Sequence, residues 1–403
     1  MLNSTINKKK RYYIYLGVFF LFFIFGVVMM QSLQSSLQGT TMILGVDLYP
    51  RWVGTKAVLY GNSPYTLETR QQIWLSIYGS ADIPDGNPFG FYYPPAIVTL
   101  LIPFVFLGLS AATAAMLWCA FLWALLSTAL FVWIVNLQNM LFSRWVILFL
   151  LVSGWLFRPA FSNYILGQFA LFSVLMAIAG WYFFETDRPV LAGIFSALSL
   201  VKPSLTILPV ALFFILYRHK KKGLVFFIIS LLILYLPPTF MLRWWVPDFL
   251  HDISGYSLEN SVAWSFNDIK TPSGLIWLAA SILLLWFASH LKDKILILSS
   301  ALALNAIFVP HTADYDLVAF IPLIIYLSYA WFQMKRNKIE LYILYIILLW
   351  FPWISLVSML ILRQNLATTV EAWYRVVWLT YPGIILISVL LTKFFIIKPV
   401  RHD

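Results

Sequence analysis

Long apolar runs occupy most of the chain, and short polar stretches separate them. The first run extends from Tyr12 to Met30. An α-helix needs about 20 residues to cross about 30 Å of hydrocarbon. Further runs lie at Ala96–Leu107, Ala111–Val135, Trp145–Phe157, Phe169–Phe184, Val190–Val201, Ser204–Tyr217, Leu224–Leu242, Leu275–Ser289, Ile295–Val309, Leu317–Phe332, Leu341–Leu362 and Val376–Phe395. These runs leave no room for a soluble domain, so we predict an all-α polytopic membrane protein with a single integral domain, residues 1–403.

The longest polar stretch, residues 31–91, follows the first apolar run. It contains "YPRWVGTKAVLYG" and "TLETRQQIWLSIYG", two segments of helix length that mix aromatic and charged residues and end at Gly61 and Gly79. Such segments are typical of helices that lie in the membrane interface, and glycine commonly ends a helix. The sequence therefore predicts a first loop, residues 31–91, with interfacial helices.

The basic residues are placed in a way that predicts the orientation in the membrane. Hydrophobic residues make up 62% of the chain, charged residues 11%, and the mean hydropathy is +0.85. The net charge of +11 comes from clusters such as "NKKKR", "RHKKK" and "MKRNK", each beside an apolar run. This pattern is the positive-inside signature and speaks against nucleic-acid binding. We expect a bacterial plasma-membrane protein with a cytoplasmic N-terminus, a retained first helix and an extracytoplasmic first loop.

The number of crossings between residues 92 and 217 conflicts with this orientation. Six apolar runs that begin outside would end outside, whereas "RHKKK" should be cytoplasmic. One short run could be re-entrant. Alternatively, Val190 to Tyr217 could form one helix kinked at Lys202 and Pro203, because proline is tolerated in a span when neighbours satisfy the backbone. The sequence leaves both possibilities open.

The ionisable residues favour chemistry at the outer interface. Most acidic residues fall on predicted outer segments, and Lys202 is nearly alone within the spans. An ion-coupled carrier would place such groups near the bilayer centre. An outer-face enzyme needs an activated donor that arrives as a lipid, such as a polyprenyl-phosphate sugar, together with a carboxylate base and cationic or hydrogen-bonding partners for the departing phosphate. A single cysteine, Cys119, excludes a disulfide framework.

Five strings in order resemble one enzyme family. They are "DLYPRWVGTKAVLYGNSPY", "FYYPPAIVTLLIPFVFLG", "ILGQFALFSVLMAIAGW", "RPVLAGIFSALSLVKPSLTILPVALFFIL" and "VPHTADYDLV". Over roughly Asp47 to Leu317, the chain resembles glycosyltransferase family 87 of the GT-C superfamily, and within it the polyprenol-phosphate-mannose-dependent mannosyltransferases. The resemblance implies a GT-C fold with roughly 11–13 transmembrane or re-entrant segments and an inverting transfer of a sugar, mannose by analogy, to a glycolipid or glycan hydroxyl. It implies no metal and no cofactor.

The resemblance also implies roles for particular residues. Asp47 matches the general base, and His311 matches a residue that faces the donor phosphate. We expect Lys202 and Arg51 to bind the same phosphate, at roughly 6–10 Å from Asp47 by analogy with inverting carboxylate pairs. The residues expected to line the substrate site are Tyr93, Asn163, Gln168, Asp314 and Asp316.

Each of these residues also has a simpler interpretation. Asp47 could cap the helix that follows Pro50, and Lys202 could bond carbonyls freed by a kink. Asn163 and Gln168 could join helices through their amides. Arg51 could contact lipid headgroups, and Tyr93 could belong to an interfacial aromatic belt. His311 could be an ordinary interfacial residue. Asp314 and Asp316 could orient His311 or bind a cation. A flippase for lipid-linked sugars and a noncatalytic envelope-assembly subunit remain alternative functions.

Overall fold

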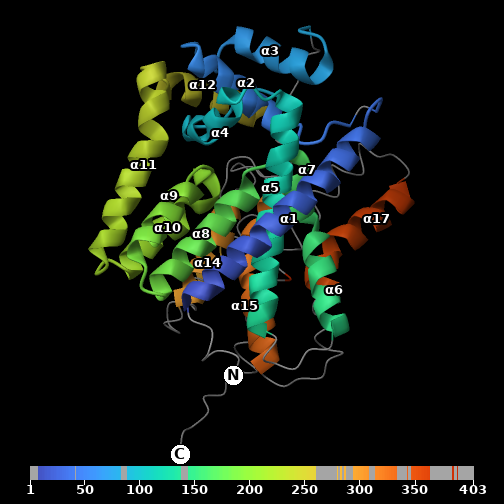
Figure 1. Cartoon of the computed structure of the whole chain (residues 1–403), viewed down its shortest axis with the longest axis vertical. Coiled ribbons are helices and arrows are strands. Elements are labelled where there is room, and N and C mark those ends of the chain that lie inside the picture. The colour runs from blue at the N-terminus through green and yellow to red at the C-terminus, as the bar shows by residue number, and fades with distance from the viewer. Residues whose placement is uncertain are drawn as a thin grey trace, which may run out of the picture. The chain divides into compact units, whose positions relative to one another are not determined.

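The computed structural model describes residues 8–40, 42–82, 89–137, 144–259, 294–307, 314–333 and 346–363, with a few isolated positions beyond these ranges (Figure 1). Within these ranges the chain forms fifteen α-helices and no strand. Three of the helices are long and apolar enough to cross a membrane: Tyr13–Ser36, Ala111–Val135 and Lys221–Leu242. The all-α polytopic membrane fold is thus confirmed, while the total of 11–13 segments stays a prediction.

The chain divides into two compact units, each assembled from separate segments. The first unit comprises residues 1–132, 162–203 and 218–261, and the second comprises residues 133–161, 204–217 and 262–403. The helices are α1 (Lys8–Ser36), α2 (Leu48–Leu59), α3 (Leu67–Tyr78), α4 (Ala96–Phe106), α5 (Ala111–Leu137), α6 (Arg144–Trp155), α7 (Arg158–Leu166), α8 (Ala170–Glu185), α9 (Pro189–Ser199), α10 (Pro203–Leu216), α11 (Lys221–Leu242), α12 (Val246–Glu259), α14 (Lys294–Ile307), α15 (Ile321–Gln333) and α17 (Phe351–Arg363). A single integral domain over the whole chain stays our proposal.

Aromatic and small residues hold the first unit together. Phe22 of α1 meets Trp123 of α5 edge to face, with ring centroids 5.7 Å apart. Helices α8, α9 and α11 pack closely because small residues lie at their contacts. A Cβ atom at Gly193 of α9 would lie 2.3 Å from the carbonyl oxygen of Gly223 in α11, and one at Gly180 of α8 would lie 2.7 Å from Ser196 Oγ. These glycines therefore set the helix spacing.

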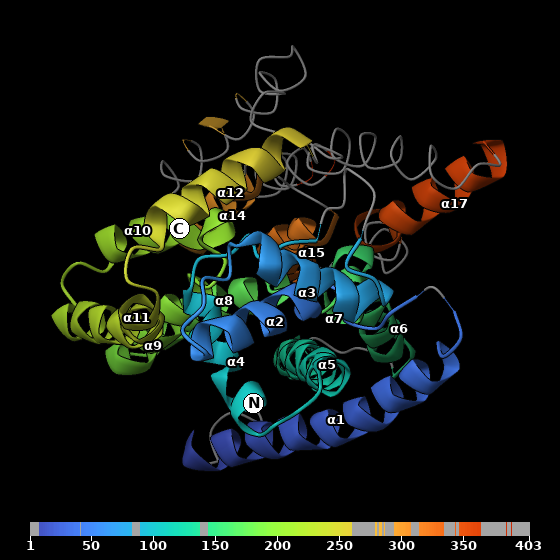
Figure 2. The same cartoon turned by 90° about the horizontal axis from the view of Figure 1, so that it is seen from above.

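The first loop forms two helices where its sequence predicts them, and their place in the membrane interface stays a prediction. Helix α2 ends at Leu59, and Gly61 takes a φ of +78° just beyond it. Helix α3 begins after Thr66, whose hydroxyl accepts a hydrogen bond from the Thr69 amide, and ends at Gly79 in the left-handed conformation. In Figures 1 and 2, α2, α3, α4 and α12 gather at one end of α5 and α11, away from the basic N-terminal end of α11.

Two helix breaks lie in the region where the crossing count left two possibilities open, and the number of crossings there stays a prediction. Helix α9 ends at Ser199 and α10 begins at Pro203, so the chain from Val190 to Tyr217 is two helices. Helices α7 and α8 meet at an angle of 114°, which is the geometry of a broken span or a re-entrant loop. The bend lies at Gly167, which has a φ of +75° that glycine adopts without strain.

Hydrogen bonds and a ring contact join the helices of the second unit. Asn305 of α14 accepts a hydrogen bond from the Leu208 amide of α10 at 2.8 Å. The indole N–H of Trp350 donates to Ser153 Oγ of α6 at 3.0 Å, and the ring of Trp353 meets Phe161 at a centroid distance of 5.6 Å. Polar atoms on otherwise apolar helices thus fix helix register, as expected where water is excluded.

Candidate functional site

Backbone contacts bring the start of α2 to the bend between α7 and α8. The amide of Gly45 donates to the carbonyl of Ile165 at 2.8 Å, and the amide of Asp47 donates to that of Leu166 at 3.0 Å. The chains approach closely because both sides are glycine: a Cβ at Gly167 would lie 3.3 Å from Gly45 Cα. Residues 45–47 and 165–168, distant in sequence, therefore form one structure.

The carboxylate of Asp47 points away from the helix that it precedes. Asp47 occupies the N-cap position of α2, but its side chain makes no capping hydrogen bond. It instead accepts a hydrogen bond from Nε2 of Gln168 at 2.6 Å. The N-cap interpretation accounts for the position of Asp47 in the helix, but not for the orientation of its side chain. Asp47 as a residue is half-buried.

Gln168 joins Asp47 to a buried arginine. Its Oε1 accepts a hydrogen bond from Arg51 Nη2 at 2.7 Å. A guanidinium offers donors only, and an ionised carboxylate accepts only. The amide of Gln168 therefore has one possible orientation, with its oxygen toward Arg51 and its nitrogen toward Asp47. This chain of charge-assisted hydrogen bonds holds the Asp47 carboxylate in place.

Arg51 is fully buried, with 0% of its surface exposed. Its Nη1 donates to the carbonyls of Asp47 and Gly167, and its Nη2 donates to the Tyr93 hydroxyl as well as to Gln168. The guanidinium lies 4.1 Å from the Tyr93 ring centroid, close enough for a cation–π interaction. Nε has no hydrogen-bond partner within the described part of the chain. Contact with lipid headgroups is not possible for a side chain so enclosed.

An aromatic wall completes the site, and sequence reasoning missed it. Trp118 of α5 stacks on Phe169 with ring centroids 4.3 Å apart, and its indole N–H donates to the Gly167 carbonyl at 3.2 Å. Phe169 in turn lies 5.2 Å from the Arg51 guanidinium. The available signal was a tryptophan inside a span, since a buried indole N–H needs an acceptor.

Two other predicted residues lie in or beside this network. Tyr93 is half-buried, accepts from Arg51 and, through its carbonyl, accepts from the Tyr65 hydroxyl at 2.8 Å. Asn163 is fully buried, and its Oδ1 accepts from the amide of Leu171 in the first turn of α8 at 2.8 Å. Asn163 therefore joins α7 to the first turn of α8 through its amide, which agrees with its simpler interpretation. For both Tyr93 and Asn163, contact with substrate stays a prediction.

The remaining predicted site residues are Lys202, His311, Asp314 and Asp316. Lys202 is half-buried between α9 and α10, and Asp316 is 1% exposed in a short 3-10 helix, Asp314–Phe320, of the second unit. His311 and the side chain of Asp314 lie outside the described residues. Their predicted roles stay predictions. Within the described residues, no three His, Cys, Asp or Glu side chains cluster closely enough to hold a metal ion.

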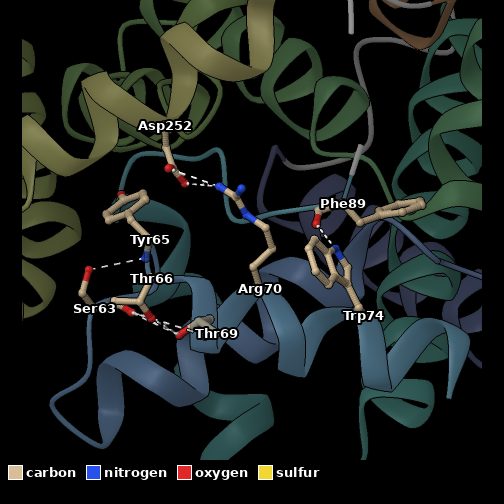
Figure 3. A network of polar contacts seen from close by, with 8 residues as sticks. All are labelled: Ser63, Tyr65, Thr66, Thr69, Arg70, Trp74, Phe89 and Asp252. Carbon is tan, nitrogen blue, oxygen red and sulfur yellow. Dashed lines mark hydrogen bonds and ion pairs between the residues drawn. The ribbon is translucent and has the colours of Figure 1, made fainter. Parts of the chain in front are cut away.

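An ion pair fastens the first loop to α12 (Figure 3). Arg70 of α3 reaches both carboxylate oxygens of Asp252 at 3.2 Å. Burial raises the pKa of Asp252 above its usual value, and the opposing effect of Arg70 does not fully cancel it. Nearby, the Trp74 indole donates to the Phe89 carbonyl at 2.9 Å. The ion pair thus links α3 to α12, and the cost of desolvating the carboxylate opposes its attraction to Arg70.

The fold and this site define a helical membrane protein with a loop-borne carboxylate fixed at a helix break. The sequence profile of glycosyltransferase family 87 matches residues 91–331, more than half of the chain. The protein is therefore a membrane glycosyltransferase. It belongs to glycosyltransferase family 87. No curated protein and no solved structure matches the chain. The matched stretch includes Tyr93, Asn163, Gln168 and Lys202, whereas Asp47 and Arg51 precede it.

Proposed function

We propose that this protein transfers a mannose residue from a polyprenyl-phosphate donor to a hydroxyl of a glycolipid or glycan on the extracytoplasmic face of the membrane, with Asp47 as general base. One observation supports this most: the Asp47 carboxylate is oriented by Gln168 and Arg51 rather than by its own helix. A capping aspartate would need neither partner. A base must be held in one orientation to accept a proton efficiently.

The distribution of charge supports the outer face as the location of the reaction. Helix α11 begins with the basic residues Lys221 and Lys222, and α2, α3 and α12 lie at its other end (Figure 1). Because basic residues favour the cytoplasmic side, we propose that Asp47 lies outside. Cytosolic nucleotide sugars do not reach that side, so the donor is carried by a lipid whose headgroup lies at the interface.

The reaction is a single displacement. Asp47 takes the proton of the acceptor hydroxyl as its oxygen attacks the anomeric carbon of the donor sugar. The bond between that carbon and the phosphate oxygen breaks, the electron pair leaves with polyprenyl phosphate, and the configuration inverts because base and leaving group lie on opposite faces. Lys202 and His311 are our proposed partners of the departing phosphate, since cations stabilise its developing charge.

For Arg51 we propose a positioning role. Both terminal nitrogens already donate to protein acceptors, so a phosphate would have to displace one of them. The buried positive charge polarises the Gln168 amide, which in turn holds Asp47. A low-dielectric surrounding strengthens such hydrogen bonds. Arg51 therefore acts on the reaction through Gln168 and Asp47 and through the Tyr93 hydroxyl.

The test is a transfer assay with the full chain purified in lipid nanodiscs. Polyprenyl-phosphate-mannose is the donor, nucleotide mannose is the comparison, and a mannosylated glycolipid is the acceptor. Transfer from the lipid donor alone supports the proposal, and Asp47→Asn should reduce the rate by about 10²- to 10⁴-fold, the usual contribution of general base catalysis. The exposed Asp82→Asn is the matched control. In sealed proteoliposomes, movement of the donor across the bilayer without product formation would identify a flippase instead.

A further inference from the structure

A polar cavity of about 330 Å³ lies between α2 and α3, separate from the site at Asp47. Its lining consists of Lys56, Ala57, Tyr60, Asn62, Glu68, Thr69 and Gln72. The long side chains are exposed at its rim, whereas Ala57 and Thr69 are buried and form its floor. A volume of this order is at the lower end of the range of small-molecule sites. None of these residues takes part in the mechanism proposed above.

The walls of the cavity are fixed by helix ends. The amide of Asn62 donates to the Ala57 carbonyl at 2.9 Å and closes α2, and Gly61 allows the turn that follows. On the other side, Thr66 caps α3, and the Thr69 hydroxyl donates to the Ser63 carbonyl at 3.1 Å (Figure 3). The cavity is therefore built on two capped helices joined by a short turn, which gives a ligand a preformed surface.

The side chains around the cavity suit an uncharged polyol. Glu68 and Gln72 are four residues apart on α3 and so lie on one helix face, while Lys56 lies in the last turn of α2 and Tyr60 directly follows that helix. Together with Asn62 they offer amide, carboxylate, ammonium and phenol groups to hydroxyls, and Tyr60, 72% exposed, offers a ring face. The Lys56 ammonium and the Glu68 carboxylate offset each other, so the lining has no net charge that would favour a phosphate. A lining so polar does not suit an acyl chain.

Helix α2 connects the cavity to Asp47. Asp47 immediately precedes the first turn of that helix, and Lys56 lies nine residues further on. At 1.5 Å per residue, the two are about 13 Å apart along the helix axis. We propose that the cavity binds a sugar residue of the acceptor glycan that is remote from the reacting hydroxyl. This inference rests on the proposed function, because it assigns the cavity to the same acceptor.

A remote subsite of this kind changes binding more than chemistry. Loss of one hydrogen bond to a sugar hydroxyl weakens binding about 5-fold. We therefore expect Gln72→Ala and Glu68→Gln each to raise the KM of an acceptor with a trimannoside headgroup by about that factor, with kcat unchanged. An acceptor with one mannose, too short to reach the cavity, should be unaffected. Gln71→Ala is the matched control, since Gln71 is the adjacent glutamine on α3 and does not line the cavity.

The decisive measurement is direct binding of methyl mannotrioside to the full chain by saturation-transfer NMR. We expect the triple variant Asn62→Ala, Glu68→Gln and Gln72→Ala to bind at least 10-fold more weakly, and Gln71→Ala and Asp47→Asn to bind as wild type does. Equal binding by the triple variant would overturn the inference, and so would displacement of the trimannoside by inorganic phosphate. Because binding is measured without transfer, these outcomes stay distinct from a failure of the proposed reaction, which would show as absent product in wild type.

Discussion

At the residue scale, Gln168 links the buried Arg51 to Asp47, the proposed base. Its two amide atoms face groups of opposite demand, Arg51 as a donor and Asp47 as an acceptor. Few residues meet both demands: glutamate supplies only an acceptor when ionised, and leucine supplies neither. Substitutions of Gln168 can therefore distinguish a role in hydrogen bonding from a role in packing.

The first prediction concerns the pH dependence of Gln168→Glu. Two carboxyl groups in contact share a proton, which raises one pKa of the pair. The introduced glutamate can donate to Asp47 only while it keeps that proton. We expect the pH optimum of transfer to move to lower pH, because activity is lost as the shared proton leaves on the alkaline side. Rates measured from pH 5 to 9 check this.

Gln168→Leu serves as the comparison for that shift. It removes the donor to Asp47 without adding a titrating group, so the rate should fall at every pH while the optimum stays where it is in wild type. An acid shift in both variants would mean that the shift arises from disturbed packing, and Gln168 would lose its assigned role.

The second prediction concerns Arg51→Lys. A lysine keeps the charge, but a single ammonium cannot reach the four acceptors that the two guanidinium nitrogens serve. Acceptors at Gly167, Gln168 and Tyr93 then lose donors inside the fold. We expect the free energy of unfolding, measured by denaturant titration in detergent, to fall by about 2–4 kcal/mol. Arg218→Lys, at an exposed position, should leave it unchanged. Equal values for both variants would show that the network contributes no stability.

At the element scale, close helix contacts depend on the absence of side chains. A Cβ atom at Gly54 of α2 would lie 2.1 Å from Cδ2 of Phe91. Phe91 lies two residues before Tyr93, in the segment that leads into α4. Phe91 is 1% exposed, so its ring has little space to move. The contact between this ring and α2 therefore places Arg51 and Tyr93 side by side.

The third prediction follows from this contact. Gly54→Ala should lower the free energy of unfolding by about 1–3 kcal/mol, the usual cost of overpacking. A second substitution, Phe91→Leu, vacates part of the space and should recover part of the loss. Gly17→Ala, which meets no atom within 4 Å, should change stability by less than about 0.5 kcal/mol. If Phe91→Leu worsens the effect of Gly54→Ala, the ring is not the obstacle.

At the scale of the whole molecule, the membrane orientation decides which substrates the protein meets. In the first unit the basic start of α11 and the loop helices α2 and α3 lie at opposite ends (Figure 1). The single cysteine, Cys119, is buried, so wild-type protein gives little background in thiol labelling. The orientation is therefore directly measurable.

The fourth prediction is a labelling pattern in intact cells. Ser80→Cys, at an exposed position after α3, should react with a membrane-impermeant maleimide added outside. Lys222→Cys, at the start of α11, should react only after the cells are opened, and wild type should stay unlabelled. Outside labelling at position 222 would place Asp47 in the cytoplasm, where nucleotide sugars are available, and would remove the argument for a lipid-linked donor.

The sequence by itself determined the features that depend on local pattern. The apolar runs predicted the helices, because each must satisfy its own backbone in lipid. Gly61 and Gly79 predicted the ends of the loop helices, because a left-handed residue stops a helix. The ordered strings indicated the family that the match over residues 91–331 shows. Asp47 and Gln168 were both singled out, but as separate candidates.

Only the tertiary structure decided that those candidates lie in contact with each other. The contact between Asp47 and Gln168 spans 121 positions, and that between Arg51 and Gln168 spans 117. No local pattern encodes such distances. They arise because Gly45 and Gly167 let two backbones meet at the α7–α8 bend. The burial of Arg51 likewise depends on tertiary packing. The rings of Tyr93 and Phe169 lie over its guanidinium from two separate segments, and Trp118 of a third segment stacks on Phe169, so that water is excluded around the charge.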